Sequence, residues 1–229
     1  LIFRAQVSHI GSNFSCIDIM AVLFEKIDFN KDKFILSKGW AAASLYYFLW
    51  KYGRITEDEL NSYCQEGSRF IGLSEPIHPD IPFAGGSMGL GLPAAVGFAL
   101  AKKLKGEEGK VYVLMSDGEM QCGTTWESLA IADHHKLNNL VVMVDWNGLQ
   151  AMGKIEDILR PKIDKVDFYN GHSFQDVEKA LNITGRDCSV WLFFQTIKGK
   201  GVSFMENNNL YHYKNLTQDE YERARAELG

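Results

Sequence analysis

Runs of apolar residues without polar alternation recur along the chain, and this pattern is typical of strands buried on both faces of a parallel sheet. The runs cover residues 34–37, 111–115, 140–144 and 190–197. Elsewhere, apolar positions at steps of three and four residues, or a capping start, indicate helices at 16–27, 40–50, 94–104, 174–181 and 217–228. Strands alternating with helices predict an α/β fold, with a mainly parallel sheet that carries helices on both faces.

Turn and capping signals separate these segments. Thr56 precedes Glu57-Asp58-Glu59, the arrangement of a capped helix start. A turn containing Gly11 leads into the first helix, and Lys38-Gly39 forms a tight turn before the second. Residues 67–83 form a proline-rich loop, and residues 154–182 are the least regular part of the chain apart from the helix at 174–181.

Composition narrows the class of protein. With 229 residues, 46% of them hydrophobic, the chain can bury a large core, and we expect residues 1–229 to form a single domain. A net charge of −5 without a dense Lys/Arg block argues against a nucleic-acid partner. Four scattered cysteines without CxxC spacing indicate neither a zinc site nor a disulfide framework, which fits a reducing cytosol.

Targeting signals are also missing from the sequence. No apolar run approaches the roughly 18 to 20 residues of a membrane span, and the start Leu1-Ile2-Phe3-Arg4 does not have the form of a signal peptide. We therefore expect a cytoplasmic protein that does not contact a membrane.

Polar residues end the two central apolar runs. Asp117-Gly118 follows the run at 111–115, and Asn147 follows the run at 140–144, thirty residues later (147 − 117). The carboxyl ends of parallel strands meet at one rim, where ligands bind, so we expect Asp117 and Asn147 to lie side by side. A carboxylate and an amide oxygen suit a hard cation such as Mg²⁺, with a diphosphate as its natural partner. Alternatively, Asp117 caps the next helix and Asn147 forms a turn with Gly148.

A glycine-rich segment, residues 85–93, precedes the helix at 94–104. Glycines at a helix start allow an anion to approach the backbone, but they also allow a helix to pack closely against its neighbour. The order G-x-x-G-x-G after a proline-rich loop differs from the dinucleotide fingerprint, so a Rossmann NAD site is not supported. His9 and Lys38 lie at turns where each could contact a phosphate, although a solvated lysine is the commoner outcome.

Taken together, these residues resemble the thiamin diphosphate fingerprint, which has an acidic residue followed by glycine and an asparagine about thirty residues later. The segments 116–127, 134–140 and 144–150 resemble the cofactor domain of transketolase, and so do 8–11, 34–39, 86–91 and 198–206. The resemblance covers nearly the whole chain. The α subunit of 2-oxo-acid dehydrogenases is less similar, because it has E-N-N where this chain has Asp145-Trp146-Asn147.

The resemblance implies a thiamin diphosphate-binding fold and a role for each matched residue. Asp117 and Asn147 would bind Mg²⁺ or Ca²⁺ with their side chains, and Leu149 would add its main-chain carbonyl. The remaining cofactor-binding residues would be Gly118 at the diphosphate with Glu119 beside it, Asn147 and Leu149 at the cation, and Gly86, Ser87 and Met88 along the cleft for the two rings.

Two histidines and one glutamate match further family positions. His9 matches a histidine that contacts cofactor phosphate and substrate hydroxyls, and His212 corresponds to a histidine near the donor sugar. Both are the candidate catalytic residues. Glu127 matches an acidic residue of the family's dimer interface.

The length carries a further expectation under this resemblance. Ordinary transketolase continues into a pyrimidine-binding domain, which supplies the glutamate that activates the cofactor, and into a C-terminal domain. We therefore expect this chain to be the N-terminal subunit of a split transketolase, completed by a separate C-terminal subunit in a dimer of heterodimers. The implied reaction is transfer of a two-carbon ketol unit between ketose and aldose sugars or sugar phosphates, with the cofactor as electron sink.

Departures from the family pattern concentrate where the sugar should bind. Trp40 replaces a substrate-contacting histidine, next to Lys38, and Leu90 stands where the glycine segment usually has Gln or His. Cys122 stands where the family usually has a glutamate that links cofactors across the dimer. We take Lys38, Trp40 and His78 as the candidate residues of the substrate pocket.

Two segments, 72–86 and 155–172, are shorter than usual for the family, so His78 matches the family's donor-contacting histidine only loosely. Together, the departures indicate an altered, less phosphorylated or bulkier substrate, or a reduced activity. Two alternatives to an enzyme subunit remain open from the sequence. One is a noncatalytic binding or regulatory partner that kept the cofactor fold, and the other is a general phosphate-binding α/β protein.

Overall fold

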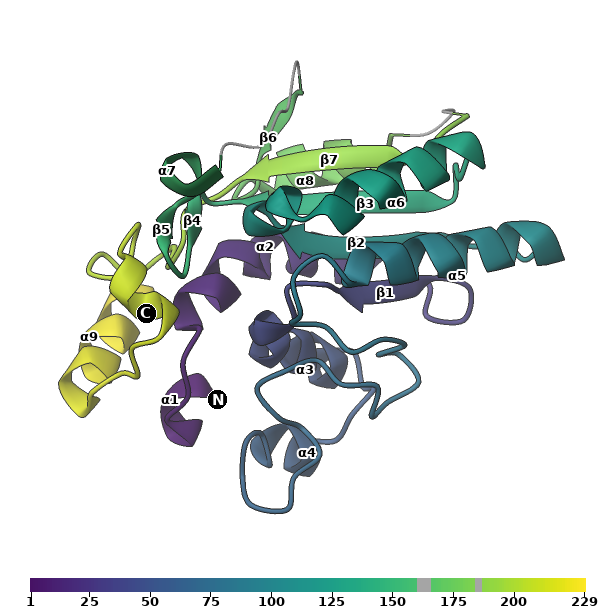
Figure 1. Ribbon diagram of the computed structural model, residues 1–229. Helices are drawn as coiled ribbons and strands as arrows, with labels where there is room; N and C mark the ends of the chain where they lie inside the picture. The colour runs from purple at the N-terminus through teal and green to yellow at the C-terminus, as the bar shows by residue number, and fades with distance from the viewer. Residues whose placement is uncertain (160–165, 184–186) are drawn as a thin grey trace.

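A parallel five-stranded sheet forms the centre of the molecule (Figure 1). The computed structural model describes residues 1–159, 166–183 and 187–229. The strand order is β1-β2-β3-β7-β6, and every neighbouring pair in this sheet is parallel. The strands are β1 (Lys33–Leu36), β2 (Val111–Ser116), β3 (Leu140–Trp146), β7 (Val190–Gln195) and β6 (Phe168–Asn170).

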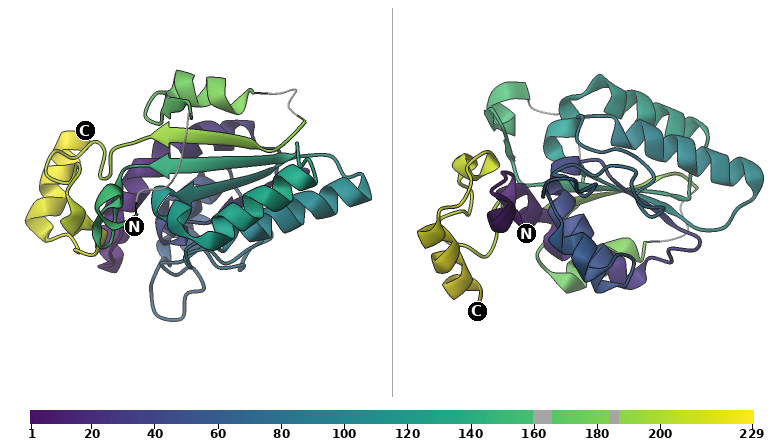
Figure 2. Two further views of the ribbon diagram at one scale, coloured as in Figure 1. Left: turned by 45° about the horizontal axis from the view of Figure 1, so that its top comes forward. Right: turned by 90° about the horizontal axis from the view of Figure 1, so that it is seen from below.

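Helices cover both faces of the sheet, as Figure 2 shows with the sheet seen between its two helical layers. One face carries α2 (Ile10–Lys26), α3 (Ala42–Lys51) and α8 (Phe174–Leu181), and the other carries α5 (Gly91–Lys105) and α6 (Gly123–His134). Alternate residues of one strand supply the two cores: Leu114 packs on the first face, whereas Val113 and Met115 pack on the second. The apolar runs lack polar alternation because both strand faces are buried.

Short elements surround the carboxyl ends of the strands, toward which the arrowheads point in Figure 1. An antiparallel hairpin of β4 and β5 follows β3, and the 3₁₀ helix η2 follows β2 directly. The peripheral elements are α1 (Ile2–Ala5), η1 (Gly39–Ala41), α4 (Glu57–Asn61), η2 (Asp117–Gln121), β4 (Leu149–Gln150), β5 (Gly153–Lys154), α7 (Ile155–Leu159), η3 (Asn209–His212) and α9 (Gln218–Leu228).

The predicted fold class is confirmed, and so are the four predicted strands within two residues at each end. The capping boxes at Thr56 and Thr217 are both formed. The fifth strand, β6, was not predicted, and its three residues are too few to give a periodic signal. Gly11 lies inside α2 rather than in a turn before it, because the helix already begins at Ile10.

One sequence expectation falls partly outside the described chain. The segment 155–172, expected to be short, includes residues 160–165, which lie outside the described residues. No helix among the described residues is long and apolar enough to span a membrane. All four cysteines are free thiols.

Glycines allow the segment before α5 to lie directly against the end of β1. A Cβ atom added to Gly85 would lie 2.0 Å from the carbonyl oxygen of Leu36, and one added to Gly39 would lie 2.2 Å from the carbonyl carbon of Gly85. A Cβ atom on Gly91 would similarly lie 2.3 Å from Ser37 Oγ. The alternative of close packing, left open by the sequence, is therefore one function of these glycines.

We expect Gly85→Ala to destabilise the fold by about 2–3 kcal/mol, because the added methyl group meets backbone atoms that cannot move independently. Gly97→Ala is the matched control, since Gly97 is exposed within α5 and an added Cβ meets no atom of the described chain within 4 Å. This control should gain about 0.5–1 kcal/mol from its higher helix propensity. Urea unfolding followed by circular dichroism measures both, and equal stability of the two variants would contradict the proposed steric constraint.

Candidate functional site

A cavity of about 510 Å³ opens at the carboxyl ends of β1, β2 and β3. Its walls come from the ends of these strands, the glycine segment and the β4–β5 hairpin, and from the segments around the start of α2 and the end of η3. The lining residues are Ser8, His9, Ser12, Ser37, Lys38, Trp40, Gly86, Met88, Ser116, Asp117, Gly118, Glu119, Asn147, Leu149, Gln150, Ala151, Met152, His212 and Tyr213.

Asp117 and Asn147 lie at the same rim, and one hydrogen bond links their segments. Asp117 Oδ2 accepts from the backbone N–H of Gly148 at 2.6 Å, and its Oδ1 accepts from the N–H of Gly118 at 2.8 Å. Asn147 Oδ1 accepts from the N–H of Leu149 at 3.0 Å, which is an Asx turn. The turn expected from Asn147-Gly148 is therefore present, whereas no side chain among the described residues caps α6 at its N-cap position.

The carboxyl group of Asp117 is buried beside a second carboxylate. Burial and the negative charge of Asp145 raise the pKa of Asp117 to about 7, against the opposing effect of the Gly148 N–H and Lys38. A divalent cation at this rim would favour the ionised form, since positive charge stabilises a carboxylate. The described residues hold no cluster of three or more His, Cys, Asp or Glu side chains suited to a metal. A cation here would therefore depend on one carboxylate, the Asn147 amide and main-chain oxygens.

Lys38 is buried, and the expectation of a solvated side chain is wrong. Its ammonium group forms a close ion pair with Asp145 on β3 and also donates to the carbonyl of Ser12 at 3.1 Å. Burial is the largest influence on the pKa of Lys38 and acts to lower it, but the charge and hydrogen bond of Asp145, together with Cys16 and Asp117, leave the pKa above its ordinary value. The anion that Lys38 reaches belongs to the protein itself.

Glu119 connects the glycine segment to the ends of β1 and β2. Its carboxylate accepts from the Ser37 hydroxyl, from the N–H of Gly89 at 3.2 Å and from the N–H of Ser116 at 2.8 Å. Burial raises the pKa of Glu119 above its ordinary range despite these bonds. Because its carboxylate is occupied by donors of the protein, Glu119 supports the wall of the cavity.

Gly118 lies where a side chain would enter the cavity. The atoms nearest to an added Cβ would be Met88 Cε at 3.1 Å and the Gln150 side chain, with Oε1 at 3.6 Å and Cβ at 3.7 Å. Gly86 borders the same cavity with a φ of 109°, a conformation that favours glycine. Gly118 therefore borders the cavity with bare backbone, whereas an added Cβ on Gly86 would lie 2.2 Å from Leu73 Cδ2, so close packing also requires glycine there.

The opposite wall consists of aromatic and imidazole rings. His9 stacks on Trp40 with ring centroids 4.6 Å apart, and His212 meets His9 edge to face at 4.9 Å. Tyr213 contacts both histidines. Burial, with the nearby positive charges of Lys198 and Lys38, lowers the pKa of His9 to about 4 and that of His212 to about 3. Both imidazoles are therefore neutral near pH 7.

Lys198 contacts His212 and so supports this wall. It was not among the candidate residues selected from the sequence. Its ammonium group lies 2.7 Å from His212 Nδ1, and its side chain is 1% exposed. Burial and the charge of Lys38 lower the pKa of Lys198 to about 8. The sequence signal that could have identified Lys198 is its position directly after the apolar run at 190–197. Asp117 was selected because it lies at such a strand end.

Two predicted site residues, His78 and Ser87, lie away from the cavity lining, and so do Leu90 and Cys122. His78 is in the loop before α5, where its Nδ1 accepts from the N–H of Asp80 at 3.2 Å. Ser87 and Leu90 are outside the lining, although Gly86 and Met88 belong to it. Cys122 packs against Gly89 at the start of α6.

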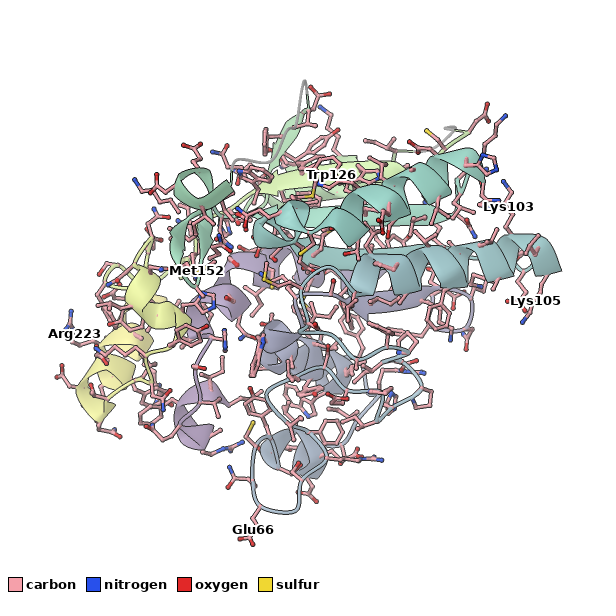
Figure 3. All side chains as sticks on the ribbon, in the orientation of Figure 1. Glu66, Lys103, Lys105, Trp126, Met152 and Arg223 are labelled. Atoms are coloured by element: carbon pink, nitrogen blue, oxygen red, sulfur yellow. The ribbon has the colours of Figure 1, made fainter. Side chains whose placement is uncertain are left out.

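All other candidate residues line this cavity, namely His9, Lys38, Trp40, Gly86, Met88, Asp117, Gly118, Glu119, Asn147, Leu149 and His212. Glu127 is exposed on α6. Sequence reasoning missed Gln150, Met152 and Tyr213, because hairpin and loop residues carry no periodic signal. Figure 3 labels Met152, which lies at the β4–β5 turn and is 76% exposed.

The two sides of the cavity differ in chemistry. One side presents carboxylate, amide and main-chain oxygens at the ends of β2 and β3, which suit a cation. The other presents neutral imidazoles and aromatic rings, which suit hydroxyl groups and planar or apolar surfaces.

Comparison with known proteins agrees with this arrangement. The family model described as "Transketolase, thiamine diphosphate binding domain" matches residues 1–229. One of the subunits of apulose-4-phosphate transketolase from Phocaeicola vulgatus is 30% identical over all of this chain and 88% of its own length. The corresponding subunit from Actinobacillus succinogenes is 34% identical over 96% of this chain and 87% of its length.

Full-length transketolases are longer than this chain. Human transketolase is 30% identical over 98% of this chain but only 39% of its own length. The crystal structure of transketolase from Campylobacter jejuni matches 99% of this chain and 40% of that chain, with 25% identity and a TM-score of 0.87. The chain therefore belongs to the transketolase family, and all of its residues are matched by the family's thiamine diphosphate-binding domain.

Proposed function

We propose that this chain, as one domain over residues 1–229, is the cofactor-binding subunit of a transketolase-like transferase. It would bind thiamin diphosphate through Mg²⁺ or Ca²⁺ and act with a separate C-terminal subunit that supplies the activating glutamate. The complete enzyme, a dimer of heterodimers in the cytoplasm, would transfer a two-carbon ketol unit between a ketose and an aldose.

The observation that carries this proposal is the rim formed by Asp117, Gly118, Asn147 and Leu149. A carboxylate, an amide and a main-chain carbonyl from two neighbouring strand ends offer oxygen ligands to a hard cation. Gly118 leaves the adjoining space free for a diphosphate, since an added Cβ would enter the cavity there. The residues present therefore fit the cofactor that the family description names.

The remaining lining residues have separate tasks in the proposed reaction. Neutral His9 and His212 can each donate and accept a hydrogen bond, so they can orient substrate hydroxyl groups without adding charge. Met88 and Gly86 provide an apolar wall for the cofactor rings. Thiamin diphosphate, when bound, supplies the electron sink for carbon–carbon bond cleavage next to a carbonyl group.

Relatives indicate the class of substrate. The relatives from P. vulgatus and A. succinogenes are named for apulose 4-phosphate, and a relative from Clostridium, 31% identical over 98% of this chain, is named for 6-deoxy-6-sulfo-D-fructose. All three names contain "transketolase" and designate one subunit of it. We infer a sugar or sugar-phosphate substrate for this chain also, handled with a partner subunit.

Asp117→Asn should weaken Mg²⁺-dependent binding of thiamin diphosphate at least about tenfold, because the amide removes the carboxylate charge of the rim while keeping its shape. Isothermal titration with and without Mg²⁺ measures the change. Asp157→Asn on α7 is the control, since Asp157 is exposed and does not line the cavity. Tight cofactor binding that ignores Mg²⁺, or preferential binding of ATP in the same titration, would refute the proposed function.

Trp40→His should change substrate preference without weakening cofactor affinity, because the indole lies on the ring side of the cavity, away from the cation rim. Ketol transfer by the chain mixed with its C-terminal subunit, assayed on a panel of ketoses and aldoses, measures the preference. A loss of cofactor affinity with unchanged preference would place the indole in the cofactor site instead.

The neutral state of the two histidines predicts a dependence of stability on pH. Both folded pKa values, about 4 for His9 and about 3 for His212, lie below the unfolded value of roughly 6.5. The unfolded chain therefore binds protons first, so stability should fall as the pH drops from about 6.5 toward 4. Nitrogen-detected NMR titration of the imidazoles should find both neutral at pH 5.5, and protonation of either near pH 6.5 would contradict the burial argument.

A further inference from the structure

A second cavity of about 390 Å³ adjoins the first on the far side of the His9–Trp40 stack. Four residues line both cavities, so this group forms the wall between them: Ser8, His9, Trp40 and Tyr213. The whole second cavity is called the outer pocket below. Its other six lining residues are Gln6, Val7, Tyr63, Cys64, Gly72 and Asn215. The proposed function assigns no role to these six residues.

The wall between the cavities is held in place from behind by Asn13. The side-chain amide of Asn13 donates to the carbonyl oxygen of His9 at 2.9 Å and to that of Trp40 at 3.3 Å. Its own oxygen accepts from the N–H and the hydroxyl of Ser44, each at 2.9 Å. His9 has a φ of 68°, which is uncommon for a residue with a side chain, and these bonds fix it. The ring surfaces are thus preorganised.

The described residues that line the outer pocket include no Lys, Arg, Asp or Glu. Burial and positive neighbours keep His9 neutral by lowering its pKa to about 4, and burial raises the pKa values of Tyr63 and Cys64 above their ordinary range. The cofactor cavity, in contrast, contains Lys38, Asp117 and Glu119. The outer pocket therefore offers neither a counter-charge for a phosphate nor a site for a cation.

What the outer pocket does offer is aromatic surface with neutral hydrogen-bonding groups. Trp40 has one face stacked on His9 but is still 44% exposed, and Tyr213 is 64% exposed, so part of each ring remains accessible to a ligand. Ser8, Tyr63, Gln6 and Asn215 line the same pocket with uncharged polar side chains, although the amide nitrogens of Gln6 and Asn215 also donate to carbonyl oxygens of the protein. Aromatic faces combined with neutral donors and acceptors suit a molecule that has an apolar face and a hydroxylated edge.

Gly72 keeps the outer pocket open. An added Cβ atom there would lie 3.8 Å from Trp40 Cζ3, 3.9 Å from Cys64 Sγ and 3.9 Å from the hydroxyl of Tyr63, which are ordinary contact distances. A small side chain at this position would thus be tolerated, and a large one would occupy the space between these three residues.

We propose that the outer pocket is a subsite for an uncharged, hydroxylated part of the sugar substrate, such as a pyranose ring or a polyol chain, stacked on Trp40 and Tyr213. This inference rests on the proposed function, because it makes the outer pocket an extension of the same active site. The end of the substrate that enters the pocket carries no phosphate, and Trp40 is a specificity-determining residue for that end.

The test follows the indole N–H signal of Trp40 by NMR in the isolated chain, with Trp40→Phe to assign it. Methyl β-D-glucopyranoside and sorbitol should shift this signal with saturation in the millimolar range, and glucose 6-phosphate should bind at least about tenfold more weakly. No saturable shift with either neutral probe, or tighter binding of glucose 6-phosphate, would overturn the proposal.

Gly72→Leu should reduce affinity for the neutral probes at least about tenfold by filling the pocket. Gly97→Leu on α5 makes the same chemical change where no atom of the described chain lies within 4 Å of the added Cβ, and it should leave the affinity unchanged. Tyr63→Phe removes one hydroxyl without changing the shape and should weaken binding severalfold. Unchanged probe affinity in both Gly72→Leu and Tyr63→Phe would place the bound sugar elsewhere.

Cofactor titration separates this inference from the proposed function. Gly72→Leu should bind Mg²⁺ and thiamin diphosphate as tightly as the unaltered chain, because the outer pocket does not touch the cation rim. If the unaltered chain shifts the Trp40 signal with neutral sugars but binds no cofactor, the proposed function fails and the sugar subsite stands. If it binds cofactor but no sugar probe, the subsite fails alone.

Discussion

The buried ion pair between Lys38 and Asp145 is the interaction on which the rest of the site depends. It joins the turn after β1 to the end of β3, two segments separated by 107 residues in sequence. Ser15 on α2 and Thr196 after β7 donate hydroxyl groups to the same carboxylate, so one pair of charges connects four elements. Removing either partner would leave an uncompensated buried charge, which costs about 3–5 kcal/mol. The ends of these elements, which carry the cavity, are thereby fixed relative to one another.

The same pair also contributes to the charge states around the cavity. The negative charge of Asp145 raises the pKa of Asp117, whereas the positive charge of Lys38 lowers the pKa values of His9, His212 and Lys198. Burial shifts the pKa of each of these four groups more than the ion pair does. The charge of Asp145 or Lys38 then shifts the pKa in the same direction as burial. The side of the cavity that carries Asp117 is consequently suited to a cation. The side that carries His9 and His212 stays neutral. A cation and a hydroxylated substrate thus have separate places in one cavity.

Local sequence patterns predict the strands of this structure and the residues at the strand ends. Buried strands follow from unbroken apolar runs, and the position of Asp117 and Asn147 at a common rim follows from parallel topology. The burial of Lys38 could not be predicted in this way, because its partner lies far along the chain and nothing near Lys38 signals it. Likewise, the positions of Trp40 and Tyr213 in a shared wall depend on how two distant loops meet. Loop contacts of this kind are set by tertiary packing, and therefore the sequence around His78 and Ser87 does not determine whether their side chains line the cavity.

One departure from the family pattern, Trp40, can now be located beside the cavity, whereas the other two, Leu90 and Cys122, lie outside its lining. Trp40 and Tyr213 are both in the wall between the cofactor cavity and the outer pocket, and Gly72 lies on the outer side of that wall. The hydrogen bonds of the oxygen-bearing rim at Asp117 and Asn147 involve none of these three residues. A change in the wall can therefore alter which sugar is accepted while the groups suited to a cation keep their geometry. This separation explains how a chain can match the family where a cofactor would be held and differ from it where the substrate would enter.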